Sequence, residues 1–168
     1  MSYLPPVYPA DTRLLELRTA ELLLVATLRL FVATWREPDE DYPDWRSGFR
    51  AVGILAGAGP AFETLFGTVM ALPHRERKVC SPCCPFLAPD EGRLLQLVSL
   101  LQRARVGDGR AILADWLPAS AARLSLSPAQ ELAAAMMRGD LVVPLRHAEA
   151  AIRHGDTIHA DRGMVLLH

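Results

Sequence analysis

Apolar residues recur every three or four positions through most of the chain, which is the spacing of one face of an α-helix. The first such stretch begins at Asp11 or Thr12, ends before Pro38 and is apolar around most of its circumference. The positions that follow the helical spacing are Leu17, Leu24, Leu28, Phe31 and Trp35. A helix of this kind is typical of the centre of a bundle or of a buried dimer contact. We therefore expect this helix to be central and the protein to form a homodimer.

Proline and glycine divide the rest of the chain into further helices. Ser127, Pro128 and Gln130 have the residue types and spacing of a helix start, and Gly139 follows the last apolar position of that helix. The other helices are expected at about 43–55, 60–73, 89–101 and 108–117, with a further helical turn at 118–124. The pattern predicts an all-α fold, a multi-helix bundle of about six to eight helices in one domain over residues 1–168.

Two segments depart from this helical pattern. The loop 73–89 carries four prolines and separates the chain into two helical halves. Near the C-terminus, a short β-type run at 141–143 precedes a helical stretch at 147–154. The last residues, 157–167, have turn-forming residues between two apolar runs, so we expect a small C-terminal β-hairpin there.

The most distinctive motif is the sequence CSPCCP at 80–85, within this proline-rich loop. A C-x-x-C pair places two thiolates around one metal ion, and zinc prefers four sulfur or imidazole ligands in a tetrahedron. A zinc finger normally has a second ligand pair at a recognisable distance, which this sequence lacks, so three unreactive, packed cysteines remain an alternative. The candidate ligands of a structural zinc are His74, Cys80, Cys83 and Cys84, with a distant histidine as the alternative to Cys84.

The same cysteines suggest a second interpretation, a thiol-based redox sensor. Arg75, Arg77 and Lys78 precede the motif, and nearby cations lower the pKa of a thiol. Cys80 or Cys83 would be the reactive sulfur. The motif does not follow a strand and open a helix, as it does in thioredoxin-like proteins, so the sequence does not predict that fold.

A third interpretation is a winged-helix-like regulator that binds DNA. The last third of the chain can be read as a helix-turn-helix followed by a hairpin. A basic patch near the fourth helix would contact phosphate groups, through Arg93, Arg103, Arg105 and Arg110. The net charge of −1 makes a nucleic-acid partner the less favoured reading.

Composition and targeting signals place the protein in the cytoplasm. Hydrophobic residues make up 51% of the chain and charged residues 22%, which rules out intrinsic disorder. The longest apolar stretch is interrupted by Arg29 and bounded by Glu21 and Arg36, so it is too short to cross a membrane. The first ten residues do not resemble a secretory signal, and an odd number of clustered cysteines does not indicate a secreted disulfide framework.

The function that the sequence favours is association with another protein. In that case the cysteine loop is a structural feature or a zinc staple, and the sensor and the DNA-binding regulator are the alternatives. No pair of residues has the spacing that a named reaction requires, so a non-enzymatic role is favoured although catalysis is not excluded.

Overall fold

Six α-helices and one short 3-10 helix make up the computed structural model, which describes residues 3–72 and 74–147. The described residues contain no β-strand, so the predicted all-α multi-helix bundle is confirmed, and the run 141–143 is not a strand. The predicted hairpin and nearly all of the predicted helix at 147–154 lie outside the described residues. The elements are η1 (Leu14–Glu16), α1 (Thr19–Arg36), α2 (Ser47–Ala51), α3 (Leu55–Ala71), α4 (Pro89–Leu101), α5 (Val106–Trp116) and α6 (Ala119–Arg138).

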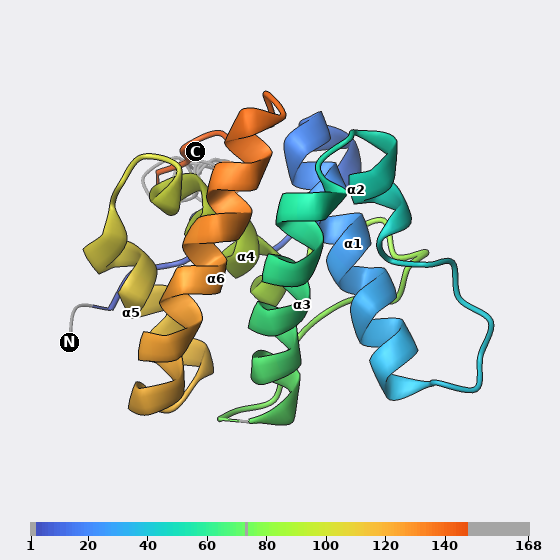
Figure 1. Cartoon of the computed structure of the whole chain (residues 1–168), viewed down its shortest axis with the longest axis horizontal. Helices are drawn as coiled ribbons and strands as arrows, with labels where there is room; N and C mark the ends of the chain where they lie inside the picture. Colours follow the sequence, from blue (N-terminus) through green and yellow to red (C-terminus); the bar gives the residue numbers. More distant parts are fainter. Residues whose placement is uncertain (1–2, 73, 148–168) are drawn as a thin grey trace, which may run out of the picture.

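The central helix of the bundle is α4. Every residue of α4 after Pro89 is buried, and α1, α5 and α6 all pack against it. In Figure 1, α4 lies behind the front layer of α6, α3 and α1, with α5 at the left-hand edge. The sequence pattern predicted that the first helix would be central, but α4 occupies that place. Its sequence, PDEGRLLQLVSLL, is less apolar than that of α1, yet it is enclosed on every side.

Helix α1 begins at Thr19, seven or eight residues later than its sequence pattern predicts. The reason is that the chain before it is tied to the cysteine loop. Leu14 N–H donates to Pro85 O (2.9 Å), and Leu87 N–H donates to Thr12 O (2.9 Å). Residues 12–14 therefore run beside 85–87 and cannot continue the helix.

The basis for the homodimer prediction is weaker in the folded chain than in the sequence. Neighbouring elements bury α1 residues on several sides, among them Thr27, Leu28 and Arg29. The large apolar side chains of α1 that stay exposed are Leu22 (38%) and Trp35 (50%), and their spacing places them on different faces of the helix. Homodimer formation stays a prediction.

Two prolines lie inside helices where the sequence predicted a helix start. Pro128 is in the middle of α6, which runs unbroken from 119 to 138, so the predicted start at Ser127 is wrong. Pro60 likewise lies inside α3, which begins at Leu55. In both cases burial of apolar residues before the proline outweighs the local preference for a break. Leu126 in α6 and Ala58 in α3 are both buried.

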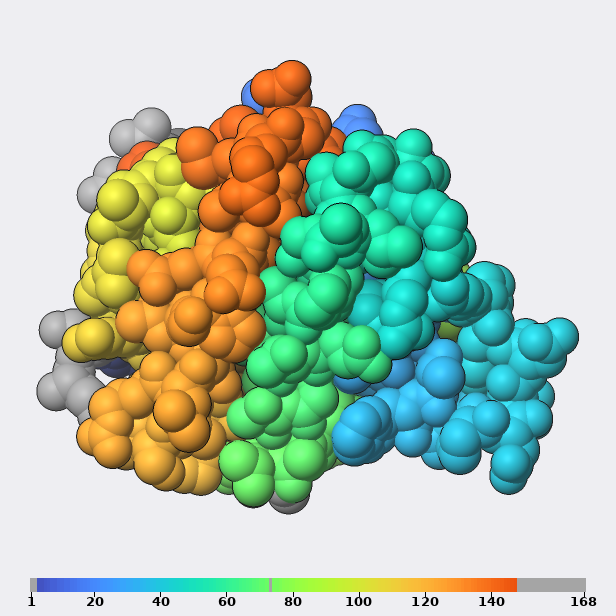
Figure 2. Space-filling view, in the orientation of Figure 1, coloured from blue at the N-terminus to red at the C-terminus, as the bar shows by residue number. Residues whose placement is uncertain are grey.

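Aromatic side chains from both halves of the chain meet in one core. Phe62 lies 5.7 Å from Phe31 and 4.7 Å from Phe66, measured between ring centroids, and Phe66 lies 5.9 Å from Trp116 in α5. Figure 2 shows α6 and α3 side by side over the front of the molecule, with the residues that follow α1 projecting at the right. No helix in the described residues is long and apolar enough to span a membrane.

A buried carboxylate joins the segments at the two ends of the described chain. Glu21, fully buried in α1, accepts a hydrogen bond from the Tyr8 hydroxyl (2.6 Å) and two from Arg146 (3.0 and 3.1 Å). The Arg146 guanidinium also lies over the Tyr8 ring, 4.9 Å from its centroid. These contacts fix residues before α1 and after α6 to the same helix.

Candidate functional site

Consecutive carboxylates in the first turn of α4 anchor the cysteine loop. Asp90 and Glu91 are both buried, and the N-terminus of a helix favours negative charge. Glu91 accepts a hydrogen bond from the Ala88 N–H (2.7 Å), which satisfies one of the free donors at the start of the helix. Each carboxylate also reaches back into the loop.

Glu91 forms an ion pair with Arg29 of α1, and both side chains are almost fully buried, at 0% and 2% exposure. The contact is bidentate, with N–O distances of 2.8 and 2.9 Å. The same two groups hold the loop backbone: Arg29 donates to Cys84 O and Phe86 O (both 2.6 Å), and Glu91 accepts from Cys80 N–H (3.1 Å). The buried pair therefore fixes the backbone at both ends of the cysteine segment.

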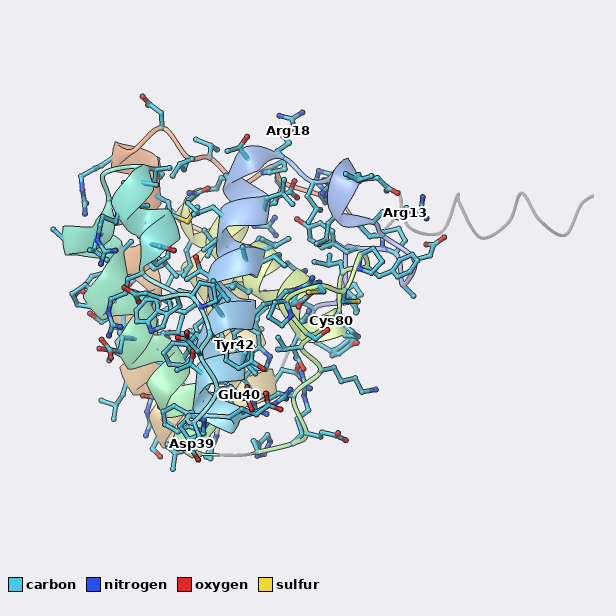
Figure 3. All side chains as sticks on the ribbon, turned by 90° about the vertical axis from the view of Figure 1, so that its right-hand side faces the viewer. Arg13, Arg18, Asp39, Glu40, Tyr42 and Cys80 are labelled. Atoms are coloured by element: carbon cyan, nitrogen blue, oxygen red, sulfur yellow. The ribbon has the colours of Figure 1, made fainter. Side chains whose placement is uncertain are left out.

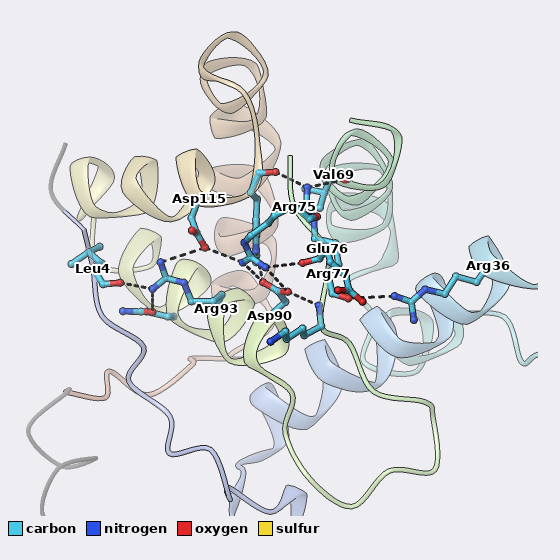
Figure 4. A network of polar contacts seen from close by, with 12 residues as sticks. Leu4, Arg36, Val69, Arg75, Glu76, Arg77, Asp90, Arg93 and Asp115 are labelled. Atoms are coloured by element: carbon cyan, nitrogen blue, oxygen red, sulfur yellow. Dashed lines mark hydrogen bonds and ion pairs between the residues drawn. The ribbon is translucent and has the colours of Figure 1, made fainter. Parts of the chain in front are cut away.

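Asp90 holds the first half of the loop. It accepts two hydrogen bonds from Arg75 (2.5 and 3.0 Å), one from Lys78 N–H (2.6 Å) and one from the Trp116 indole N–H (2.8 Å), as Figure 4 shows for Arg75. Arg75 also contacts Asp115 of α5 (2.9 Å). Burial alone would raise the pKa of Asp90, but these hydrogen bonds outweigh it and lower the pKa below its usual value of 3.8.

A tight turn brings Cys80 and Cys84 together. Cys84 N–H donates to Ser81 O (3.1 Å), which closes a turn with Pro82 at its second position, where the ring favours the required backbone angle. The turn places Cys83 at its tip, where the side chain is exposed. Cys80 and Cys84 flank the turn, with their thiols close enough to shift each other's pKa. The Cys84 thiol donates to Phe86 O (3.7 Å), and Figure 3 locates Cys80 on the loop beside α1.

The two neighbouring thiols have pKa values shifted in opposite directions. Burial raises the pKa of Cys80 to about 11, and the neighbouring Cys84 side chain and the nearby charge of Glu91 add to that effect. The neighbouring Cys80 side chain lowers the pKa of Cys84, with further contributions from the Phe86 backbone and from the positive charge of Arg29. Cys84 is thus the sulfur that loses its proton first.

This arrangement is chemically suited to disulfide formation. A thiolate is the nucleophile in thiol oxidation, and a second thiol next to it can resolve the oxidised product. Cys84 has the thiolate character and Cys80 is the adjacent thiol. Cys83, although it forms the C-x-x-C spacing with Cys80, is exposed at the tip of the turn.

The predicted zinc ligands are not gathered at one point. Cys80, Cys83 and Cys84 share the turn, whereas His74 lies on the wall of a groove between α5 and α6. In the described part of the chain, no three side chains of His, Cys, Asp or Glu are placed to hold one metal ion. The zinc site stays a prediction. The three cysteines share one turn, but His74 lies elsewhere, on the wall of the groove.

The arginines of the predicted basic patch are largely engaged within the protein. Arg93 and Arg103 donate to backbone carbonyl groups, and Arg105 pairs with Asp108 at 2.5 Å. Arg110 lines the groove between α5 and α6. Donors that already have partners are poorly placed to contact phosphate groups, so the structure adds nothing to the DNA-binding interpretation.

Arg29, Glu91 and Cys84 are the site residues whose roles the sequence interpretation missed. Arg29 carried a signal, because it is a charged residue inside an otherwise apolar helical stretch. A charge at such a position requires a buried partner. The partner is 62 residues away, which the sequence does not show.

Comparison of the chain with protein-family models, with curated proteins and with solved structures finds no match.

Proposed function

We propose that this protein is a thiol-based redox sensor whose reactive element is the pair Cys80 and Cys84. The observation that carries the proposal is that the two thiols are neighbours on a turn whose backbone is held by the buried Arg29–Glu91 pair. A rigid support of this kind keeps two sulfurs close together without a metal ion, and their opposite pKa shifts assign them different roles.

A hydroperoxide is the oxidant that fits this arrangement. The Cys84 thiolate attacks the peroxide O–O bond, forming a sulfenic acid on Cys84 and, after protonation of the leaving oxygen, an alcohol or water. The Cys80 thiol then displaces the hydroxyl group, which leaves as water, and the Cys80–Cys84 disulfide forms. A dithiol is thereby oxidised by two electrons while the peroxide is reduced by two. Cellular thiols then reduce the disulfide back to the dithiol by thiol–disulfide exchange and become a disulfide themselves.

Formation of the disulfide would affect the core through the buried Arg29–Glu91 pair. The backbone N–H of Cys80 contacts Glu91, and the backbone carbonyl of Cys84 contacts Arg29. Any change in the separation of the two cysteines therefore acts on both members of the ion pair. This is the route by which the sensor would alter the packing of α1 against α4.

Peroxide treatment of four forms of the protein tests the proposal. The parent and the Cys83→Ser variant should each lose two hydrogens by intact mass and hide two thiols from alkylation. Cys80→Ser and Cys84→Ser should form no intramolecular disulfide, and Cys84→Ser should also react most slowly with peroxide. An internal disulfide that requires Cys83, or equal reactivity of all three thiols, would contradict the proposal.

The alternatives predicted from the sequence give different results in the same samples. A zinc staple would yield near-stoichiometric metal in protein purified without chelator, and chelation would then unfold the chain. Protein association, including the predicted homodimer, would be visible as a solution mass above that of one chain. Both remain predictions, and neither is needed for the thiol chemistry.

A further inference from the structure

A large groove lies between α5 and the start of α6, away from the three cysteines. Its volume is about 690 Å³, within the range of about 300–1,000 Å³ that is usual for small-molecule sites. It lies on a different part of the surface from Cys80 and Cys84, and none of the residues used in the thiol chemistry lines it.

The floor of the groove is apolar and made of small side chains. Ala111 and Ala114 of α5 line it together with Ala119 and Ala122 at the start of α6, and Leu117 lies between the two helices. Alanine leaves room above the backbone, so the hollow is accessible to an alkyl chain. Such a surface binds hydrocarbon by removing it from water.

The rim of the groove is positively charged. Arg110 comes from α5 and Arg123 from α6, and within the described residues neither guanidinium has an ion pair or a hydrogen-bond partner. The one carboxylate at the groove, Asp108, is already paired with Arg105 (2.5 Å). Other arginines of the protein are engaged, among them Arg29, Arg75, Arg77, Arg93, Arg103 and Arg146.

We propose that this groove binds an amphiphilic carboxylate, with its alkyl chain on the alanine floor and its carboxylate at Arg110 and Arg123. A guanidinium matches a carboxylate with two parallel hydrogen bonds, which favours this head group. The rim is open to water, where a single ion pair adds little affinity. Chain burial therefore supplies most of the affinity, and the charge sets the head-group preference.

Titration with octanoate, decanoate and decyltrimethylammonium tests both parts of the proposal. Each buried methylene should tighten binding by about threefold to fourfold, so decanoate should bind about tenfold more tightly than octanoate. Decyltrimethylammonium has the same chain with the opposite charge and should bind more weakly than decanoate. Calorimetry, or chemical-shift changes of α5 and α6 residues, would measure the three affinities on the full chain.

Variants then locate the site. The double substitution Arg110→Ala with Arg123→Ala should remove the preference for decanoate over the cation, while Ala119→Trp, at an exposed position, should block the chain. Arg18→Ala removes a distant exposed arginine and should change neither the preference for decanoate over the cation nor the binding of the alkyl chain. Absence of binding, affinity independent of chain length, or a preference for decanoate over the cation that persists in the double variant would overturn the proposal, whatever the result for the cysteines.

Discussion

The Arg29–Glu91 pair shows how much structure can depend on single side chains. Between them, the guanidinium and the carboxylate satisfy each other and hold backbone groups of Cys80, Cys84, Phe86 and Ala88. A buried ion pair by itself contributes little net stability, because desolvation offsets most of the attraction. Here its value lies in fixing a loop that has no regular structure of its own.

Glu91→Gln should lower the free energy of unfolding by about 3–5 kcal/mol, because it leaves the Arg29 charge buried without a counter-charge. Denaturant unfolding would measure the loss. Glu131→Gln, which changes an exposed glutamate of α6, is the matched control and should alter stability by less than about 0.5 kcal/mol. A Glu91→Gln protein as stable as the control would show that the pair does not hold the loop.

Protonation of Asp90 makes the free energy of unfolding depend on pH at the acid end of the range. Its pKa is lowered in the folded state, so its contribution is fully present above the unfolded-state value of 3.8 and is lost as the pH falls through the lower folded-state value. Denaturant unfolding between about pH 6 and about pH 2 should therefore show a smaller acid-induced loss of stability for Asp90→Asn than for the parent. Identical slopes for the two proteins would exclude Asp90 as a source of acid sensitivity.

At the residue level, the sequence pointed to the cysteine loop, and the thiol pair proposed from the structure differs from the one that its spacing favours. The C-x-x-C spacing favours Cys80 with Cys83, but the turn opened by Ser81 and Pro82 places Cys83 at the tip and brings Cys84 back to Cys80. Proline at the second position of a turn is a recognisable signal, so this pairing was within reach of sequence reasoning. The contact with Arg29 was not, because it depends on how distant helices pack.

At the level of elements, apolar periodicity located the helices and local capping signals misplaced some of their ends. The stripes of α1, α3, α4, α5 and α6 are all visible in the sequence. The start at Ser127 was wrong because its strong local signal lies inside a longer amphipathic stretch that is buried on one face. Packing along the whole helix outweighs a preference of a few residues.

Pro128→Ala should therefore stabilise α6. Proline has no N–H and cannot donate to the carbonyl of Leu124, so alanine restores a backbone hydrogen bond and removes a steric conflict. Part of that gain is offset because alanine makes the unfolded chain more flexible. We expect a net increase of about 1–2 kcal/mol in the free energy of unfolding.

The matched control for this change is Pro89→Ala. Pro89 occupies the first position of α4, where the missing N–H is not needed, so its replacement should change stability little. Chemical unfolding of both variants gives the comparison. If Pro128→Ala proved destabilising, the proline would have to favour the folded chain in a way that helix geometry does not explain.

For the molecule as a whole, the sequence predicted the class of fold but not the helix at its centre. The apolar first helix was the natural choice, yet α4 is enclosed although it carries Asp90, Glu91, Arg93 and Gln96. Each of these polar side chains has an internal partner, which is what makes its burial tolerable. Partners supplied by distant segments are a property of the folded chain and cannot be read from local composition.

The cysteines and the groove between α5 and α6 lie in the same fold but depend on different residues. The loop is fixed to α4 and α1 through buried carboxylates, and the groove depends on small side chains of α5 and α6. Loss of the thiol chemistry should leave the groove intact, and filling the groove should leave the cysteines free to react.

The most direct test of the central claim is the thiol state of the Cys83→Ser protein equilibrated with mixtures of reduced and oxidised glutathione. We predict that Cys80 and Cys84 become protected from alkylation together, with an intact mass two hydrogens lower and no mixed disulfide at equilibrium. Two thiols that remain alkylatable at every ratio, or glutathione bound to either sulfur in place of an internal disulfide, would contradict the assignment of this pair as a redox switch.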